Sequence, residues 1–338
     1  MDKPLAIILS NTPQPSYRVV GELIAECLRE AGISVLERGV PATSDERASL
    51  AKEYEEQNAV FFHNVAMGNF HIIPGMKNIA LPAYEFSRIW NSAVEQLNQY
   101  DEIWVTTRHV AEVLKNSGVT APIVKTPPAL DRGIYPEKTD HAPRKPFRFL
   151  FVGEPHFRKG IHFLMYGFIK AFPDVGEAEL VIRSGDTPGW DVLREDIKFA
   201  AEWLPANDLR NLYAENDCYI SASLAEGLGL PIAESILCGL PVCANYWGGH
   251  RDLLTDGGYF PLSFVESPRP WTGAPQFYTP GQKCAISDET AVAAAMRDIV
   301  MSTPEKRREI AKKARENLLK NYGAASVRAV WAAHIAQL

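Results

Sequence analysis

The sequence predicts an α/β protein made of two Rossmann-like, doubly wound domains with a cleft between them. The chain has 338 residues, enough for about two domains. Short apolar runs alternate with helical patterns, as in a parallel sheet covered by helices. The alternation lapses once, in a polar stretch at 136–146 with three prolines, and then restarts. We therefore predict domains at 1–140 and 146–322, with the segment 323–338 returning to the first.

The first domain begins with a strand that the sequence marks clearly. Leu5 to Leu9 is a continuous apolar run, typical of a strand buried on both faces. Apolar residues then recur at helical spacing from Val20 to Ala31, and Gly32 stands where a C-terminal cap belongs. The other predicted elements are strands at 35–36, 59–62, 79–81, 103–105 and 123–124 and helices near 45–57, 86–99 and 108–117.

The second domain repeats the alternation. The predicted elements are strands at 149–152, 180–182, 218–220 and 241–244 and helices near 160–172, 206–215, 231–238, 288–301 and 304–321. The stretch 261–281 is rich in Pro, Gly and aromatic residues, which predicts a long surface loop.

Charge and composition narrow the class of protein. Lys and Arg number 35 and Asp and Glu 41, so the formal charge of −6 argues against a nucleic-acid binder. No apolar run approaches the ~20 residues of a membrane span, and the start has no signal-peptide pattern. The five cysteines include no C-x-x-C pair, as expected of reduced thiols. We expect a cytoplasmic protein. The basic helix at 304–321 predicts a solvated face or, as the alternative, weak contact with the inner face of a membrane.

Several motifs are absent from the sequence. It has no G-x-G-x-x-G after a strand, no P-loop and no H-E-x-x-H. It also has no D-x-D, the paired aspartates that would hold a divalent ion against a diphosphate. We therefore expect neither a resident cofactor nor a metal site.

The most informative segment runs from Ser223 to Glu234, directly after a predicted strand. Gly227 and Gly229 let the backbone approach a ligand closely, and the helix that follows supplies N–H groups and positive potential, which predicts an anion site. The carboxylates of Glu226 and Glu234 suit the vicinal hydroxyls of a sugar or ribose. A nucleotide sugar has this shape: diol, diphosphate, diol. The alternative is an ordinary strand–loop–helix turn with Glu226 in solvent.

The spacing of Glu226 and Glu234 resembles the E-x7-E signature of the retaining group 1 glycosyltransferases, which share the GT-B fold. Arg158-Lys159-Gly160, after a predicted strand, is similar to the basic residue and glycine at a helix start in that family. Gly248-Gly249-His250 resembles a segment that follows the signature. The resemblance is specific over most of 100–260 and weak over 1–99.

The resemblance implies roles for individual residues. Glu234 would bind the nucleotide ribose, and Glu226 the hydroxyls of the donor sugar. Arg158 and Lys159 would bind the diphosphate; many members carry Arg where this chain has Glu154, and Arg158 is the candidate replacement. The backbone amides of Gly227, Leu228, Gly229 and Leu230 would hold the donor sugar and phosphate. Apart from the resemblance, Ser223 is a candidate for contact with the phosphate, and capping of the turn before the glycine loop is the alternative role.

His63 is a further candidate, because it follows the strand predicted at 59–62 and the family often has a histidine near here that contacts the donor sugar. A buried histidine with an ordinary structural hydrogen bond is the alternative.

The function implied is retaining transfer of a hexosyl group from a nucleotide-diphosphate sugar, without a metal ion. We expect a UDP- or GDP-sugar as donor and a sugar, a lipid-linked molecule or a small molecule as acceptor. The alternatives are a sugar phosphorylase or sugar-nucleotide epimerase on the same fold, and a catalytically silent nucleotide-sugar binder.

Overall fold

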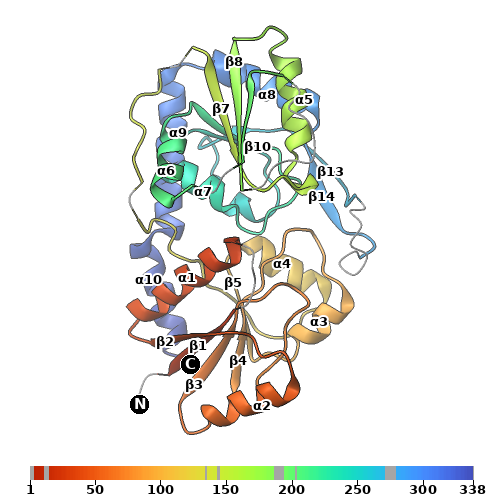
Figure 1. Ribbon diagram of the computed structural model, residues 1–338, viewed down its shortest axis with the longest axis vertical. Coiled ribbons are helices and arrows are strands. Elements are labelled where there is room, and N and C mark those ends of the chain that lie inside the picture. Colours follow the sequence, from red (N-terminus) through yellow and green to blue (C-terminus); the bar gives the residue numbers. More distant parts are fainter. Residues whose placement is uncertain are drawn as a thin grey trace. The chain divides into compact units, whose positions relative to one another are not determined.

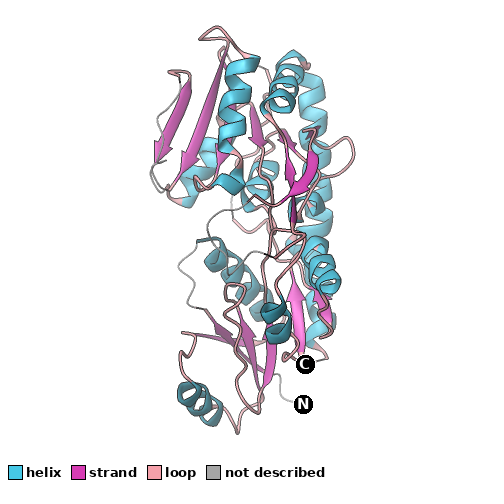
Figure 2. Ribbon diagram, turned by 90° about the vertical axis from the view of Figure 1, so that its right-hand side faces the viewer, coloured by secondary structure: helices cyan, strands magenta, loops and turns pink. Residues whose placement is uncertain are grey.

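The computed structural model describes residues 4–10, 15–133, 135–142, 145–185, 194–201, 204–270 and 279–337. The chain forms two compact units (Figure 1). Unit 1 comprises Met1–Arg132, Ala274–Gln282 and Asn321–Leu338; unit 2 comprises Gly133–Gly273 and Lys283–Lys320. Each unit contains a six-stranded parallel sheet with helices packed against it (Figure 2). The predicted fold class is confirmed.

Unit 1 has the strand order β2-β1-β3-β4-β5-β6. Its elements are β1 (Leu5–Leu9), α1 (Pro15–Glu30), β2 (Ser34–Arg38), α2 (Ser44–Glu53), β3 (Ala59–His63), β4 (Lys77–Ala80), α3 (Asn91–Leu97), β5 (Glu102–Val105), α4 (Arg108–Ser117), β6 (Ile123–Lys125) and α10 (Ala324–Ile335).

Strand β1 shows why this sheet is buried on both faces. Ala6 and Ile8 belong to one apolar cluster, which α1 and α10 complete. The alternate residues, Ile7 and Leu9, belong to a second cluster, with Tyr54 after α2. Successive side chains of a strand point to opposite faces, so an unbroken apolar run supplies both cores.

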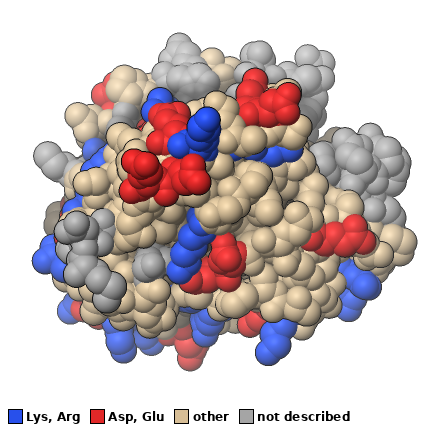
Figure 3. Space-filling model, turned by 90° about the horizontal axis from the view of Figure 1, so that it is seen from below, with Lys and Arg blue, Asp and Glu red and all other residues tan. Residues whose placement is uncertain are grey.

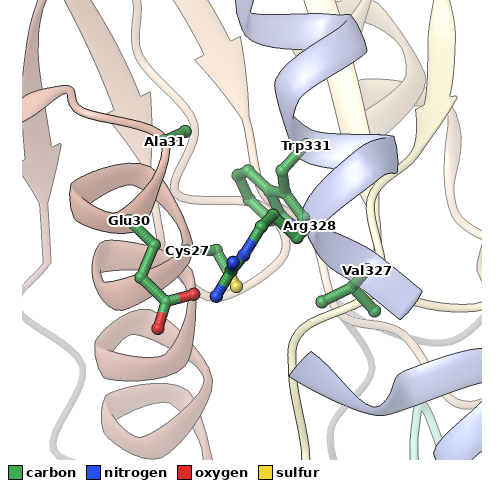
Figure 4. A pocket seen from close by; sticks show the side chains of 6 residues that line it. All are labelled: Cys27, Glu30, Ala31, Val327, Arg328 and Trp331. Carbon is green, nitrogen blue, oxygen red and sulfur yellow. The ribbon is translucent and has the colours of Figure 1, made fainter. Parts of the chain in front are cut away.

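Helix α10 returns the end of the chain to unit 1. Its Trp331 is buried against Trp104, with ring centroids 5.3 Å apart, and donates a hydrogen bond from Nε1 to the Pro127 carbonyl at 2.8 Å. A small pocket remains between α1 and α10, lined by residues that include Cys27, Glu30 and Arg328 (Figure 4). None of the predicted site residues lines it.

Unit 2 has the strand order β12-β11-β10-β7-β8-β9. Its elements are β7 (Phe147–Val152), α5 (Ile161–Ala171), β8 (Ala178–Ser184), β9 (Ile197–Ala201), α6 (Ala206–Ala214), β10 (Cys218–Ser221), α7 (Leu230–Leu237), β11 (Val242–Ala244), β12 (Phe260–Pro261), β13 (Val265–Pro268), β14 (Lys283–Ile286), α8 (Glu289–Met301) and α9 (Pro304–Tyr322), which runs on into unit 1.

The stretch predicted as a loop at 261–281 is in part a strand. Within it, β13 pairs antiparallel with β14, from Val265 opposite Ile286 to Pro268 opposite Lys283. Residues 271–278 of the predicted loop lie outside the described residues.

Candidate active site

Two glycine-containing loops meet at the carboxyl ends of β10 and β11. The first joins β10 to α7, and its Gly229, at φ 88°, directly precedes the helix. In the second, the Gly249 N–H donates to the Glu226 carbonyl at 2.6 Å. A Cβ on Gly249 would lie 1.8 Å from the Gly227 carbonyl oxygen. Only glycine permits this approach, which fixes the backbone beside Glu226.

Arg158 and Lys159 end a 3₁₀ turn, Phe157–Lys159, between β7 and α5. The Arg158 carbonyl accepts a hydrogen bond from the Leu224 N–H at 2.7 Å. Because β7 and β10 are neighbours in the sheet, this bond ties the turn after β7 to the loop after β10. Two segments more than sixty residues apart in sequence thus form one site.

The side chains of this site form an ion cluster. Lys159 Nζ lies 2.6 Å from Glu226 Oε1, and Arg158 Nη1 lies 3.3 Å from Oε2. Arg158 Nη1 also donates to the Ala225 carbonyl at 2.6 Å. The side chains of Glu226 and Lys159 are only 10% and 14% exposed, so the three charges interact with little screening by solvent.

The cluster determines the ionisation of Glu226. Burial alone would raise the pKa of its carboxyl, but the Lys159 and Arg158 charges and the Lys159 hydrogen bond hold the pKa at about 2. Glu226 is therefore a carboxylate at any physiological pH.

Glu234 lies in the first turns of α7 and has different surroundings. Its Oε2 accepts a hydrogen bond from the buried Tyr213 hydroxyl at 2.8 Å. Burial raises the pKa of Glu234 above its ordinary value of 4.5, although the Tyr213 hydrogen bond and the Arg210 charge act in the opposite direction. The two glutamates of the E-x7-E spacing thus differ in their partners. Glu226 is paired with two cations, whereas Glu234 accepts a hydrogen bond from the Tyr213 hydroxyl.

Ser223, Leu228 and Leu230 are the other residues predicted to bind the donor. Ser223 is buried, and its hydroxyl accepts a hydrogen bond from Ser221 Oγ at 3.1 Å. Its carbonyl accepts another from Asn245 Nδ2 at 2.9 Å. Both bonds stabilise the turn itself. Leu228 is buried in the loop, and Leu230 begins α7.

His250 is a site residue to which the sequence analysis gave no role. It is buried, with Nε2 2.7 Å from the Asn245 carbonyl oxygen. A Cβ on Gly229 would lie 2.9 Å from the His250 Cβ, so the base of the His250 side chain packs against the residue that precedes α7. Burial lowers the pKa of His250, and the Glu226 carboxylate acts in the opposite direction. The sequence Gly248-Gly249-His250 placed this histidine in a glycine loop. It could not show which groups of the folded protein surround the imidazole.

His63 belongs to unit 1, whereas the other nine predicted site residues belong to unit 2. It ends β3, and its Nε2 lies 2.9 Å from Asn78 Oδ1. Its ring packs edge-on against Tyr100, with centroids 4.9 Å apart. Burial lowers the pKa of His63 to about 4, so its imidazole is neutral.

Helix α9 presents charges of both signs. Arg307 is buried and donates to the His141 carbonyl at 2.9 Å, and Arg315 donates to the Leu237 carbonyl at 3.3 Å. The exposed charges are Lys306, Arg308, Lys312, Lys313 and Lys320 with Glu305, Glu309 and Glu316. Outside the grey residues, Figure 3 shows a comparable mixture on one face of the molecule. Such mixing favours a solvated face, and membrane contact stays a prediction.

Within the described part of the chain, no three His, Cys, Asp or Glu side chains gather as metal ligands would. No helix among the described residues has the length and apolar character needed to cross a membrane.

The sequence of unit 2 matches a known family. Residues 146–301, which include Lys159, Glu226 and Glu234, match the family model described as "Glycosyl transferases group 1". These residues, a little under half of the chain, thus have the sequence pattern of the group 1 glycosyltransferases. The comparison of the chain with curated protein sequences finds no match.

Several solved structures have the same fold as this chain at low sequence identity. The pneumococcal O-GlcNAc transferase GtfA, in complex with UDP and GlcNAc, has a TM-score of 0.59 and 17% identity; the match covers 86% of this chain but 60% of GtfA. Sucrose-phosphate synthase from Thermosynechococcus elongatus has a TM-score of 0.69, 14% identity and 99% coverage of both chains.

A trehalose-6-phosphate protein from E. coli, bound with UDP-2-fluoro glucose, has a TM-score of 0.67 and 12% identity, with 98% of this chain and 99% of that chain covered. A structure of trehalose-6-phosphate synthase is 12% identical to this chain, and that enzyme carries out glycosyltransfer with retention. The likeness confirms the GT-B fold over nearly the whole chain.

Proposed function

We propose that this chain is a retaining glycosyltransferase that moves a hexosyl group from a nucleotide-diphosphate sugar to an acceptor without a metal ion. The observation that carries the proposal is the cluster of Lys159, Arg158 and Glu226 beside the glycine loop that starts α7. It combines fixed positive charge for a diphosphate with a carboxylate for sugar hydroxyls. The matching family and the UDP-bound structural relatives support it.

In the proposed reaction, the bond between the anomeric carbon and the diphosphate oxygen breaks first. Lys159 and Arg158 stabilise the charge that grows on the leaving diphosphate, which is the largest contribution in many such transfers. The acceptor oxygen attacks the face that the diphosphate leaves, so the configuration is retained. The leaving phosphate oxygen takes the acceptor proton, and no protein side chain forms a covalent bond.

We assign the donor site to unit 2, with a UDP- or GDP-sugar as donor, and the acceptor site to unit 1. The acceptor classes are a sugar, a lipid-linked molecule or a small molecule. A thermal-shift panel of UDP-, GDP-, ADP- and TDP-sugars tests the donor, since a ligand at 100 times its Kd stabilises the folded state by about 2.7 kcal/mol. Phosphate-dependent cleavage or acceptor-free epimerisation would contradict transfer, and binding without turnover would indicate a silent binder.

Glu234→Ala should weaken the binding of the free nucleoside diphosphate at least about tenfold, because charge-assisted hydrogen bonds to the ribose are lost. Isothermal calorimetry measures it, and a sugar-free ligand isolates the ribose contact. Unchanged affinity would overturn the ribose assignment.

Glu226→Gln should lower kcat while nucleoside diphosphate binding stays equal or becomes tighter. The reason is the ion cluster: Glu226 neutralises Lys159 at 2.6 Å, so its removal leaves more positive charge for the diphosphate. The sugar loses its carboxylate, and an interaction made mainly in the transition state affects kcat. Calorimetry and initial rates separate the two effects. Weaker diphosphate binding, as for Glu234→Ala, would show that the two roles are confused.

A further inference from the structure

Tyr213 is a buried tyrosine whose hydroxyl contacts a proposed ligand-binding residue. It lies at the end of α6 and is 0% exposed. Its hydroxyl donates to Glu234 Oε2 at 2.8 Å. A buried phenol needs a hydrogen-bond partner, but here the partner is a carboxylate that the proposed function assigns to the nucleotide ribose.

Glu234 has several polar groups around it, but they differ in how they act on its carboxylate. In the described part of the chain, Tyr213 is the one side chain that donates a hydrogen bond to it. The titratable and charged groups that face it are Tyr213 and Arg210 from α6, Tyr135 from the segment before β7, Tyr219 from β10 and Cys238 after α7. The Arg210 guanidinium lies over the Tyr135 ring, 4.8 Å from its centroid, where it acts on Glu234 through its charge.

We infer that Tyr213 is a positioning residue for nucleotide binding: its hydroxyl holds one carboxylate oxygen of Glu234 and so orients the other toward the ribose diol. The inference rests on the proposed function. The terminal torsion of a glutamate is broad and roughly two-fold, so an unheld carboxylate must be ordered when the ligand binds. A hydrogen bond from a fully buried ring removes that freedom in advance.

The same hydrogen bond favours the ionised form of Glu234. Burial already raises the pKa of Glu234, and the Tyr213 hydroxyl opposes this by stabilising the carboxylate. Loss of the hydroxyl should therefore raise the pKa further. A protonated carboxyl accepts fewer hydrogen bonds from a diol, so nucleotide affinity falls as the pH drops through the pKa of Glu234. This fall should come at a higher pH in Tyr213→Phe than in the wild type.

The test uses ribose discrimination, which a general loss of packing would not change. Calorimetry gives the Kd of UDP or GDP, whichever binds more tightly, and of its 2′-deoxy counterpart, between pH 5 and 8. In the wild type the missing hydroxyl should cost about tenfold. In Tyr213→Phe the intact nucleotide should bind about tenfold more weakly, and the ratio of the two Kd values should fall toward one.

Tyr219→Phe is the matched control. Tyr219 is also buried, and its hydroxyl donates to the Val152 carbonyl at 3.3 Å, so the variant loses a buried hydroxyl that does not hold Glu234. It should keep the wild-type ratio and pH profile. If Tyr213→Phe matches this control while Glu234→Ala binds weakly, the inference is wrong and the ribose assignment stands. If Glu234→Ala binds normally, the ribose assignment itself fails. Tyr213→Met serves as a second hydroxyl-free variant should Tyr213→Phe not fold.

Discussion

Lys159→Ala should lower kcat about 10²–10³-fold at saturating donor, the usual scale for removing one stabiliser of transition-state charge. Lys159 Nζ is 2.6 Å from Glu226 and largely buried, so its charge acts with little screening by solvent. Steady-state rates with a saturating nucleotide sugar measure the loss. Arg158→Ala in the same series should also lower kcat.

The same assay tests the absence of a metal requirement. Wild-type activity should survive excess EDTA, since in the proposed mechanism Lys159 and Arg158 supply the positive charge that a divalent ion would otherwise supply. Lys170→Ala is the matched control for Lys159→Ala. Lys170 is exposed, and its Nζ donates a hydrogen bond to Thr290 Oγ1 at 2.8 Å. The Lys170→Ala variant should keep full activity. Activity lost in EDTA and restored by Mg²⁺ or Mn²⁺ would contradict the fixed-charge mechanism.

The regular elements of the fold could be predicted where apolar pattern and burial coincide. Leu5–Leu9 is such a case. Strand β9 was missed because it ends the sheet, and along Ile197–Ala201 only Ile197 is fully buried. Strand β13 was missed because its residues are mostly exposed and it is held by backbone pairing with β14, which leaves no apolar pattern. Hydrogen bonding of the main chain is invisible in a sequence.

One helix was predicted too long for a related reason. The helix expected at 86–99 begins only at Asn91. The residues before it make tertiary contacts instead: Ile89 is buried, and its N–H donates to Ser117 Oγ at 3.1 Å. Tertiary contacts here override a helical apolar spacing.

The candidate site could be predicted as a set of residues but not as an arrangement. The E-x7-E spacing and the basic pair were recognisable, and separate ligands were expected for Glu226 and for Lys159. The structure instead joins them directly, across 67 positions in the sequence. Tyr213 and His250 were given no role, because the sequence does not show that the Tyr213 hydroxyl contacts Glu234 on the next helix or that His250 lies beside Gly229. The Lys159–Glu226 contact depends on the sheet order, which brings β7 next to β10.

Gly160→Ala should disrupt the site although it leaves every charged group in place. Gly160 follows Lys159 and has φ 66°, a left-handed conformation that side chains disfavour. A Cβ there would lie 2.1 Å from the Ala222 carbonyl oxygen. The backbone of the turn must therefore move away from the loop after β10, and Lys159 moves with it.

We expect Gly160→Ala to lower the free energy of unfolding by about 2–5 kcal/mol, from backbone strain and the clash together, and to abolish transfer. Gly176→Ala is the matched control: its φ is +96°, but no atom lies within 4 Å of an added Cβ. It should cost about 1–3 kcal/mol from strain alone and keep full activity. Urea unfolding and transfer rates, both at a temperature where the variants are folded, compare the two. Equal losses of stability, or full activity in Gly160→Ala, would show that the turn and the loop after β10 do not need this contact to hold Lys159 beside Glu226.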